Sequence, residues 1–162
     1  MTDREMFAAA AQAVMVRLLA DTGASRTTLR IDEPALGLHT DDVAAEALAP
    51  GQASMRGEGT IRHRAADTAQ WVERHRRLLV QDDLLATDFP APKALVNGFG
   101  VKAQMLVPVE RDGRLEGWVS VHQAGASRRW SQADQKAAVQ AAAEVTALLH
   151  RSVPSPLPVP SQ

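Results

Sequence analysis

Hydrophobic positions near the N-terminus recur at the spacing of an α-helix. Phe7, Ala11, Val14 and Leu18 share one helical face, and an apolar stripe of this kind is typical of a helix that packs on a core. Gly23 follows the last of them, and glycine is the residue that most often ends a helix. The pattern predicts an amphipathic helix that ends at Gly23.

A second helix is predicted near the other end of the chain, over residues 132–151. Its apolar stripe consists of Ala138, Ala142, Val145 and Leu149. Ser131 and Asp134 stand just before this stripe with the spacing of a capping box, in which two side chains satisfy backbone N–H groups at the helix start. The stripe and the cap together predict a helix that begins after Ser131.

The clearest strand signal lies between these helices. Residues 101–110 and 115–123 each alternate apolar and polar side chains, which is the period of a β-strand. Asp112-Gly113 stands between them, and this dipeptide favours a two-residue turn with positive φ. We predict a β-hairpin.

Two segments earlier in the chain carry weaker strand patterns. Residues 25–32 are rich in β-branched side chains and alternate from Thr28 to Ile31. Residues 42–48 fit a helix or a strand, because alanine favours helices whereas Val43, Ala45 and Ala47 alternate. The residues alone leave this second segment open.

The residue pattern in the middle of the chain predicts one helix and one long loop. Over residues 61–79, Trp71, His75 and Leu78 share a helical face. Residues 80–100 contain two prolines and an Asn-Gly pair, which interrupt regular structure. Such a loop would be able to cover a site.

Composition and charge limit the partners and the location that we expect for this protein. The 162 residues include 19 acidic and 18 basic side chains, so no net charge draws the protein to nucleic acid or to a membrane surface. No apolar stretch reaches the roughly 20 residues of a membrane helix, and the N-terminus lacks the basic start of a signal peptide. We expect one cytoplasmic domain over residues 1–151 and a disordered proline-rich tail over residues 152–162.

The residue types that are missing exclude several kinds of chemistry. The chain has no cysteine, which rules out disulfides, thiolate catalysis, cysteine-bound zinc and a thioether-linked bilin. Its five histidines form no pair at metal-binding spacing. Haem needs one axial histidine, such as His75 or His122, but three phenylalanines and no tyrosine argue against a haem pocket. The cofactor, if any, is unknown.

The order of these segments resembles a GAF domain over about residues 4–150. The resemblance is carried by ASRTTLRID, AAEALAPG, the hairpin VKAQMLVPVERDGRLEGWVSVHQ and the final helix RRWSQADQKAAVQAAAEVTALL. It implies an α+β fold with a central antiparallel sheet of about six strands. The terminal helices would lie on one face, and a central helix and loops would cover a ligand pocket on the other. It also implies a strand at residues 42–48 and a homodimer formed through the terminal helices.

Side-chain alternation then divides the sheet into two unlike faces. One face is apolar and would pack the terminal helices, while the other gathers polar groups. A concave site with aromatic walls and a few polar groups is typical of small-molecule recognition. We therefore expect a binding site, with Arg30 as the charge anchor, formed by Arg30, Glu46, Trp71, His75, Gln104, Trp118, Ser120 and His122.

Three functions remain open at this point. The first is a sensory domain without catalytic activity that binds a small molecule and acts on a separate partner protein. The second is a small enzyme that uses His122 or His75 as an acid or base. The third is a dimeric structural adaptor without a ligand, whose pocket is filled by its own side chains and whose proline-rich tail docks a partner. For the site residues themselves, the alternative to ligand binding is that Arg30 and Glu46 simply pair with each other across neighbouring strands.

Overall fold

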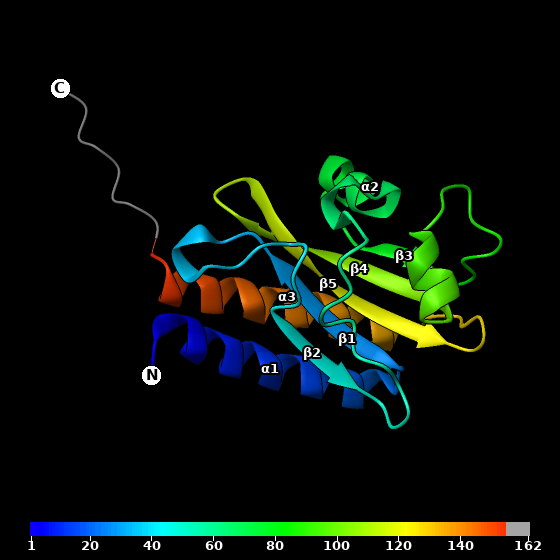
Figure 1. Cartoon of the computed structure of the whole chain (residues 1–162), viewed down its shortest axis with the longest axis horizontal. Coiled ribbons are helices and arrows are strands. Elements are labelled where there is room, and N and C mark those ends of the chain that lie inside the picture. Colours follow the sequence, from blue (N-terminus) through cyan, green and yellow to red (C-terminus); the bar gives the residue numbers. More distant parts are fainter. Residues whose placement is uncertain (155–162) are drawn as a thin grey trace.

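The computed structural model describes residues 1–154, and a five-stranded antiparallel sheet forms its centre (Figure 1). The strand order is β2-β1-β5-β4-β3, so the hairpin strands β5 and β4 lie between β1 and β3. The strands are β1 (Arg26–Ile31), β2 (Ala45–Leu48), β3 (Leu79–Gln81), β4 (Val101–Arg111) and β5 (Arg114–Ala124). The expected α+β architecture is confirmed, with five strands where the resemblance implied about six.

The two terminal helices, α1 (Asp3–Thr22) and α3 (Gln132–Ser152), lie side by side on one face of this sheet (Figure 1). Both begin with a capping box, Thr2 with Glu5 and Ser131 with Asp134, and α1 ends at Gly23 in the left-handed conformation, with φ of 61°. The start of α3 at Ser131 and the stop of α1 at Gly23 confirm the sequence prediction, which did not include the capping box at Thr2.

The core fills the space between these helices and the sheet. Leu29 and Ile31 from β1 and Val119 and Val121 from β5 are completely buried there. Phe7 of α1 packs against the same cluster. Burial of this apolar surface supplies the main driving force for the fold. It also fixes the strand register, because a slip by one residue would turn the apolar side chains to the other face.

The predicted hairpin forms with the expected turn. Arg111 pairs with Arg114, and the two residues between them, Asp112 and Gly113, have φ of 54° and 78°. These are the dihedral signs of a type I′ turn. The ambiguous segment at 42–48 contains strand β2, which pairs antiparallel with β1 so that Glu46 lies opposite Thr28.

The central helix differs from its prediction. A 3₁₀ turn, η2 (His63–Ala65), precedes the shorter helix α2 (Asp67–His75), which ends where Arg76 adopts a left-handed φ of 52°. The short strand β3, also absent from the prediction, follows directly.

The face that α2 turns to the sheet also differs. Ala69 and Val72 are buried there with Thr68, whereas Trp71 is only half-buried and His75 is exposed. The Trp71 ring stacks instead on Phe89, with 6.3 Å between ring centroids. The smaller side chains allow α2 to approach the strands closely, so the larger rings remain outside.

Two short helical turns lie in the connecting segments, η1 (Pro34–Leu36) and η3 (Ala94–Gly98), the latter within the predicted loop. No helix within residues 1–154 is long and apolar enough to cross a membrane. The predicted disordered tail consists mainly of residues 155–162, and these lie outside the described residues.

Candidate functional site

A small cavity lies on the polar face of the sheet, under η2 and the first turn of α2. Its volume is about 30 Å³. The strand register builds its floor, because Arg30 lies opposite Trp118 and Thr28 lies opposite Ser120. The lining residues from the strands are Thr28, Arg30, Gln104, Leu106, Trp118, Ser120 and His122.

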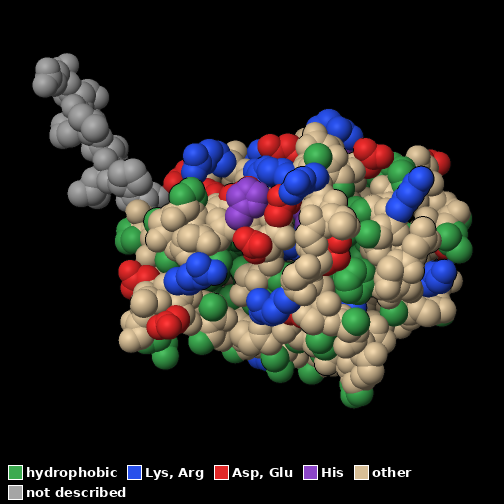
Figure 2. Space-filling view, in the orientation of Figure 1, with side chains coloured by type: hydrophobic (Ala, Val, Ile, Leu, Met, Phe, Trp, Pro, Cys, Tyr) green, Lys and Arg blue, Asp and Glu red, His purple; other side chains and the backbone are tan. Residues whose placement is uncertain are grey.

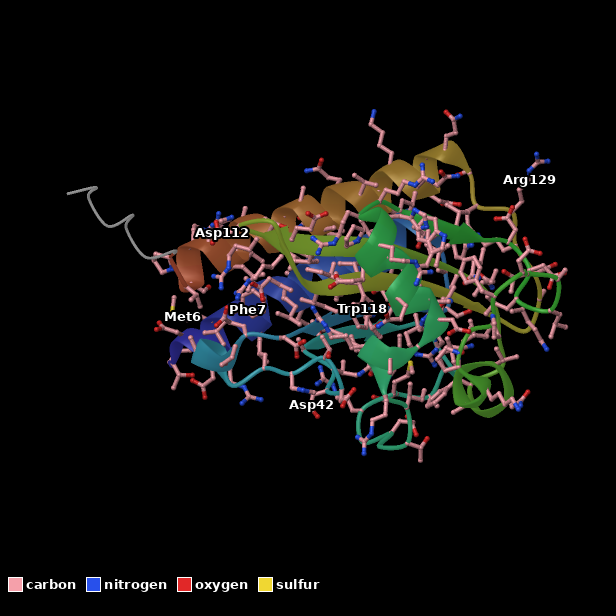
Figure 3. All side chains as sticks on the ribbon, turned by 90° about the horizontal axis from the view of Figure 1, so that it is seen from above. Met6, Phe7, Asp42, Asp112, Trp118 and Arg129 are labelled. Carbon is pink, nitrogen blue, oxygen red and sulfur yellow. The ribbon has the colours of Figure 1, made fainter. Side chains whose placement is uncertain are left out.

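The roof comes from segments that are distant in the sequence. It consists of Met55, Ile61, His63, Ala66, Thr68, Ala69, Pro92 and Leu95. Figure 3 shows Trp118 in the middle of the molecule, between the strands and the α2 segment, while Asp42, Asp112 and Arg129 lie at the periphery. The sheet therefore supplies the polar floor, and loops and α2 supply a mostly apolar cover.

Arg30 is the central charged group of the site. Its side chain is 2% exposed, and Nη1 donates a hydrogen bond to the Thr40 carbonyl oxygen at 3.2 Å. Nη2 is buried without a hydrogen-bond partner within the described part of the chain. Burial lowers the pKa of Arg30 to about 10, although Asp41 and Glu46 oppose this effect. The guanidinium therefore remains charged at neutral pH.

Glu46 does not neutralise Arg30 by direct pairing. Its carboxylate accepts hydrogen bonds from the Ser54 hydroxyl at 2.5 Å and the Met55 N–H at 2.8 Å. The nearest cation is Arg26, whose Nε lies 4.0 Å from Glu46 Oε2. The alternative in which Arg30 pairs with Glu46 is therefore wrong, because Arg26 occupies the position nearest to Glu46. Glu46 anchors the loop after β2 and does not line the cavity.

Arg26 has a different role from Arg30, although the two are on the same face of β1. Arg26 is completely buried, and its Nη2 donates to the Ala53 carbonyl oxygen at 2.6 Å. Its Nη1 lies 3.4 Å from His122 Nδ1. Arginine can only donate, so Nδ1 of His122 accepts and the imidazole is held as a neutral group with its proton on Nε2.

Both histidines of the cavity are kept uncharged by their surroundings. Burial lowers the pKa of His63 to about 4, and the charge of Arg30 adds to this effect. Burial also places the pKa of His122 well below its usual value, with Arg26 and Arg30 contributing in the same direction. His63 Nε2 is buried and has no hydrogen-bond partner within residues 1–154.

Gln104 connects the floor to the edge of the sheet. It is 1% exposed, and its amide nitrogen donates to Gln81 Oε1 at 2.8 Å. The Gln81 amide in turn donates to the Thr87 hydroxyl at 3.0 Å. This chain of hydrogen bonds holds the loop after β3 against the floor of the cavity.

A wider cleft adjoins the cavity on the outside. Its volume is about 420 Å³, and Ile61, Ala66 and Pro92 line both spaces. These three side chains therefore separate the outer cleft from the inner cavity. A ligand that enters from the cleft would pass between them.

Five of the eight predicted site residues line the cavity, namely Arg30, Gln104, Trp118, Ser120 and His122. Trp71 and His75 lie on the other side of α2 and contact each other at 4.3 Å between ring centroids. The prediction missed Thr28, His63 and Thr68. Thr28 could have been found by strand alternation, whereas His63 carried no signal in the sequence.

Comparison with known proteins identifies the family. The sequence profile of the GAF domain matches residues 7–149. The chain belongs to the GAF domain family. No curated protein matches its sequence.

Solved GAF structures resemble this one closely in fold. The cyanobacteriochrome receptor PixJ superposes with a TM-score of 0.73 at 19% identity, over 93% of this chain and 99% of that one. The blue-light absorbing form of the Thermosynechococcus elongatus PixJ GAF domain gives 0.69 at 18% identity, over 94% of each chain. The phycocyanobilin-bound GAF domain from a cyanobacterial phytochrome gives 0.69 at 15% identity, over 94% of this chain and 86% of that one. At these identities the likeness establishes the fold.

Proposed function

We propose that this GAF domain is a sensor that binds a small, polar, negatively charged molecule in the cavity under η2 and α2. The main support is Arg30, a buried charge in the cavity wall whose Nη2 has no hydrogen-bond partner among residues 1–154. Buried polar groups are almost always hydrogen-bonded, and an exception calls for an explanation such as a missing ion. An anionic ligand supplies that explanation, because guanidinium groups bind carboxylates and related oxyanions strongly.

The residues present do not fit a bilin. A phycocyanobilin-bound GAF domain is among the similar structures, but this chain has no cysteine for covalent attachment. A cavity of about 30 Å³ is also far below the roughly 300 Å³ at which pockets for larger organic ligands begin. The proposed ligand is therefore of a different class.

Signal output would pass through the opposite face of the same sheet. Arg30 belongs to β1, whose alternate residues Leu29 and Ile31 lie in the core against the terminal helices. A shift of β1 on ligand binding would thus reach α1 and α3. Val16 and Val139 leave about half of their surface exposed on these helices, which supports a homodimer or a partner protein there.

The catalytic alternative has less support from the geometry. No aspartate or glutamate is among the described residues that line the cavity, so an acid-base pair would lack its carboxylate. His122 Nδ1 is already engaged by Arg26. The adaptor alternative requires a pocket filled by its own side chains, and the remaining space of about 30 Å³ beside Arg30 speaks against it.

Nothing in the charge distribution favours a nucleic-acid partner. On the face that Figure 2 shows, Lys and Arg side chains are interspersed with Asp and Glu rather than gathered in one patch. Proteins that bind nucleic acid present basic patches or stripes. A small ligand remains the proposed partner of the site.

A thermal-shift screen with the purified chain tests the proposal. The panel contains nucleotides, amino acids, dicarboxylates and inorganic oxyanions, at matched ionic strength. We expect at least one anion to raise the melting temperature of the wild type but not of Arg30→Gln. Arg129→Gln is the matched control, because it removes one exposed arginine outside both the cavity and the adjoining cleft. Stabilisation that persists in Arg30→Gln, or no stabilisation by any anion, would refute the proposed function.

A further inference from the structure

We infer that the inner cavity selects a small monovalent oxyanion of three or four non-hydrogen atoms, of the class of nitrate, bicarbonate, formate or acetate, held between Arg30 and His63. This inference rests on the proposed function and adds the class of ligand. Four observations support it: Arg30 Nη2 and His63 Nε2 have no hydrogen-bond partner among residues 1–154, they belong to opposite walls of the cavity, the volume between those walls is small, and the lining carries one positive charge.

Two buried nitrogens of the cavity have no hydrogen-bond partner within residues 1–154, Arg30 Nη2 and His63 Nε2. The side chains that carry them are 2% and 8% exposed, so bulk water does not readily satisfy them. Arg30 donates, and neutral His63 donates when its proton is on Nε2. Both nitrogens therefore match acceptor atoms on a ligand.

The two residues belong to opposite walls of the cavity. Arg30 projects from β1 in the floor, and His63 belongs to η2 in the roof. A ligand that accepts from both would link the sheet to the cover. The hydroxyl groups of Thr28, Thr68 and Ser120 line the same space and can donate to further oxygen atoms, as a three-oxygen anion requires.

The volume limits the size of the ligand. A cavity needs about 10–15 Å³ by the same measure to hold one water molecule, so 30 Å³ corresponds to about two or three. Formate has three non-hydrogen atoms and nitrate and acetate have four, so these anions approach this size. A nucleotide or a long dicarboxylate would have to push η2 or Pro92 outward into the neighbouring cleft.

The charge of the lining limits the charge of the ligand. Among the described lining residues, Arg30 is the one that carries a charge at neutral pH, because both histidines are neutral there. One buried positive charge is balanced by a monoanion. A dianion would leave a negative charge unpaired in the cavity, which is unfavourable at a buried site.

Isothermal titration calorimetry tests this inference with nitrate, bicarbonate, formate and acetate, and with glutarate and a cyclic nucleotide as larger anions. All titrations use one chloride background, so that screening is constant. We expect saturable binding of at least one small monoanion, weakened at least about tenfold in both Arg30→Gln and His63→Leu, which corresponds to the loss of a charge-assisted hydrogen bond. His63→Gln retains an N–H donor and should recover part of the affinity.

Two controls keep the result interpretable. Arg129→Gln should bind like the wild type, because Arg129 is exposed and lines neither the cavity nor the adjoining cleft. Circular dichroism and thermal melting establish that Arg30→Gln and His63→Leu are folded. If either variant does not fold, Thr28→Val removes a lining hydroxyl at nearly constant volume and should lower the affinity for the small monoanion.

The possible failures are distinguishable. If only a larger anion binds, and its binding depends on Arg30, the size limit is overturned while the proposed function stands. If a small anion binds but His63→Leu has no effect, the bridging role of His63 is overturned. If no small monoanion binds at concentrations up to about 50 mM, where a Kd of about 10 mM would already be measurable, the inference is overturned as a whole.

Discussion

Replacing Arg30 with methionine should stabilise the ligand-free protein, although Arg30 is among its most buried side chains. Burial lowers the pKa of Arg30 to about 10, and a lowering of this size corresponds to about 3 kcal/mol of unfavourable burial of the charged form. Because the folded-state pKa is depressed, this cost is fully present at neutral pH and diminishes only above about pH 10. Methionine has a similar length and carries no charge.

The substitution also removes one favourable contact. The hydrogen bond from Arg30 Nη1 to the Thr40 carbonyl oxygen would be lost, and an unsatisfied buried carbonyl costs about 1–2 kcal/mol. The net expectation is a gain of about 1–2 kcal/mol in the free energy of unfolding. For a domain of this length the melting temperature would rise by about 2–8 °C.

Arg26→Met is the matched comparison, because Arg26 lies four residues away on the same face of β1. Its removal leaves the Ala53 carbonyl oxygen, His122 Nδ1 and the Glu46 carboxylate without their partner. Loss of one member of a buried ion pair costs about 3–5 kcal/mol, so this variant should be destabilised.

Urea unfolding at pH 7.5, in buffer without phosphate or carboxylates, measures both variants. Opposite signs for the two substitutions are the expected result. If Arg30→Met were destabilised by more than about 1 kcal/mol, Arg30 would be a structural residue, and the reasoning that connects its unpaired nitrogen to a ligand would be refuted.

Three further predictions concern the surroundings of the site. The pKa of His63 is lowered to about 4 by burial and by Arg30, against Asp41 and Glu58, so the unfolded state binds more protons between about pH 6.5 and 4. Stability should therefore fall as the pH falls through this range, and the urea midpoint of His63→Leu should fall less than that of the wild type. An equal fall in both proteins would contradict the lowered pKa of His63. Gly117→Ala should cost about 2–3 kcal/mol, because a Cβ there would lie 1.9 Å from the Arg30 carbonyl oxygen. Gly59→Ala, with open space around its Cβ position, is the control, and equal melting temperatures for both would exclude the close strand approach. Trp71→Ala should leave anion affinity unchanged in calorimetry, since Trp71 stacks on Phe89 outside the cavity. A loss of affinity would show that Trp71 belongs to the binding site after all.

The sequence by itself was sufficient for the elements that depend on neighbouring residues. The Asp112-Gly113 turn, the capping box at Ser131 and the stop at Gly23 are local features with characteristic residue types, and all are confirmed. Strand alternation, which is also local, correctly placed Arg30, Gln104 and His122 on one face of the sheet. The apolar face opposite them is confirmed as the core.

Pairing across the sheet and packing of the cover required the tertiary structure. The sequence could not show whether Glu46 approaches Arg26 or Arg30, because both lie on the same face of β1 and the register decides between them. It could not show which side of α2 meets the strands, because close approach favours Ala69 and Val72 over the larger Trp71. His63 enters the site through a 3₁₀ turn that carries no periodic signal. Local patterns thus determined the floor of the cavity, whereas long-range contacts determined its roof and left Arg30 Nη2 without a hydrogen-bond partner among residues 1–154.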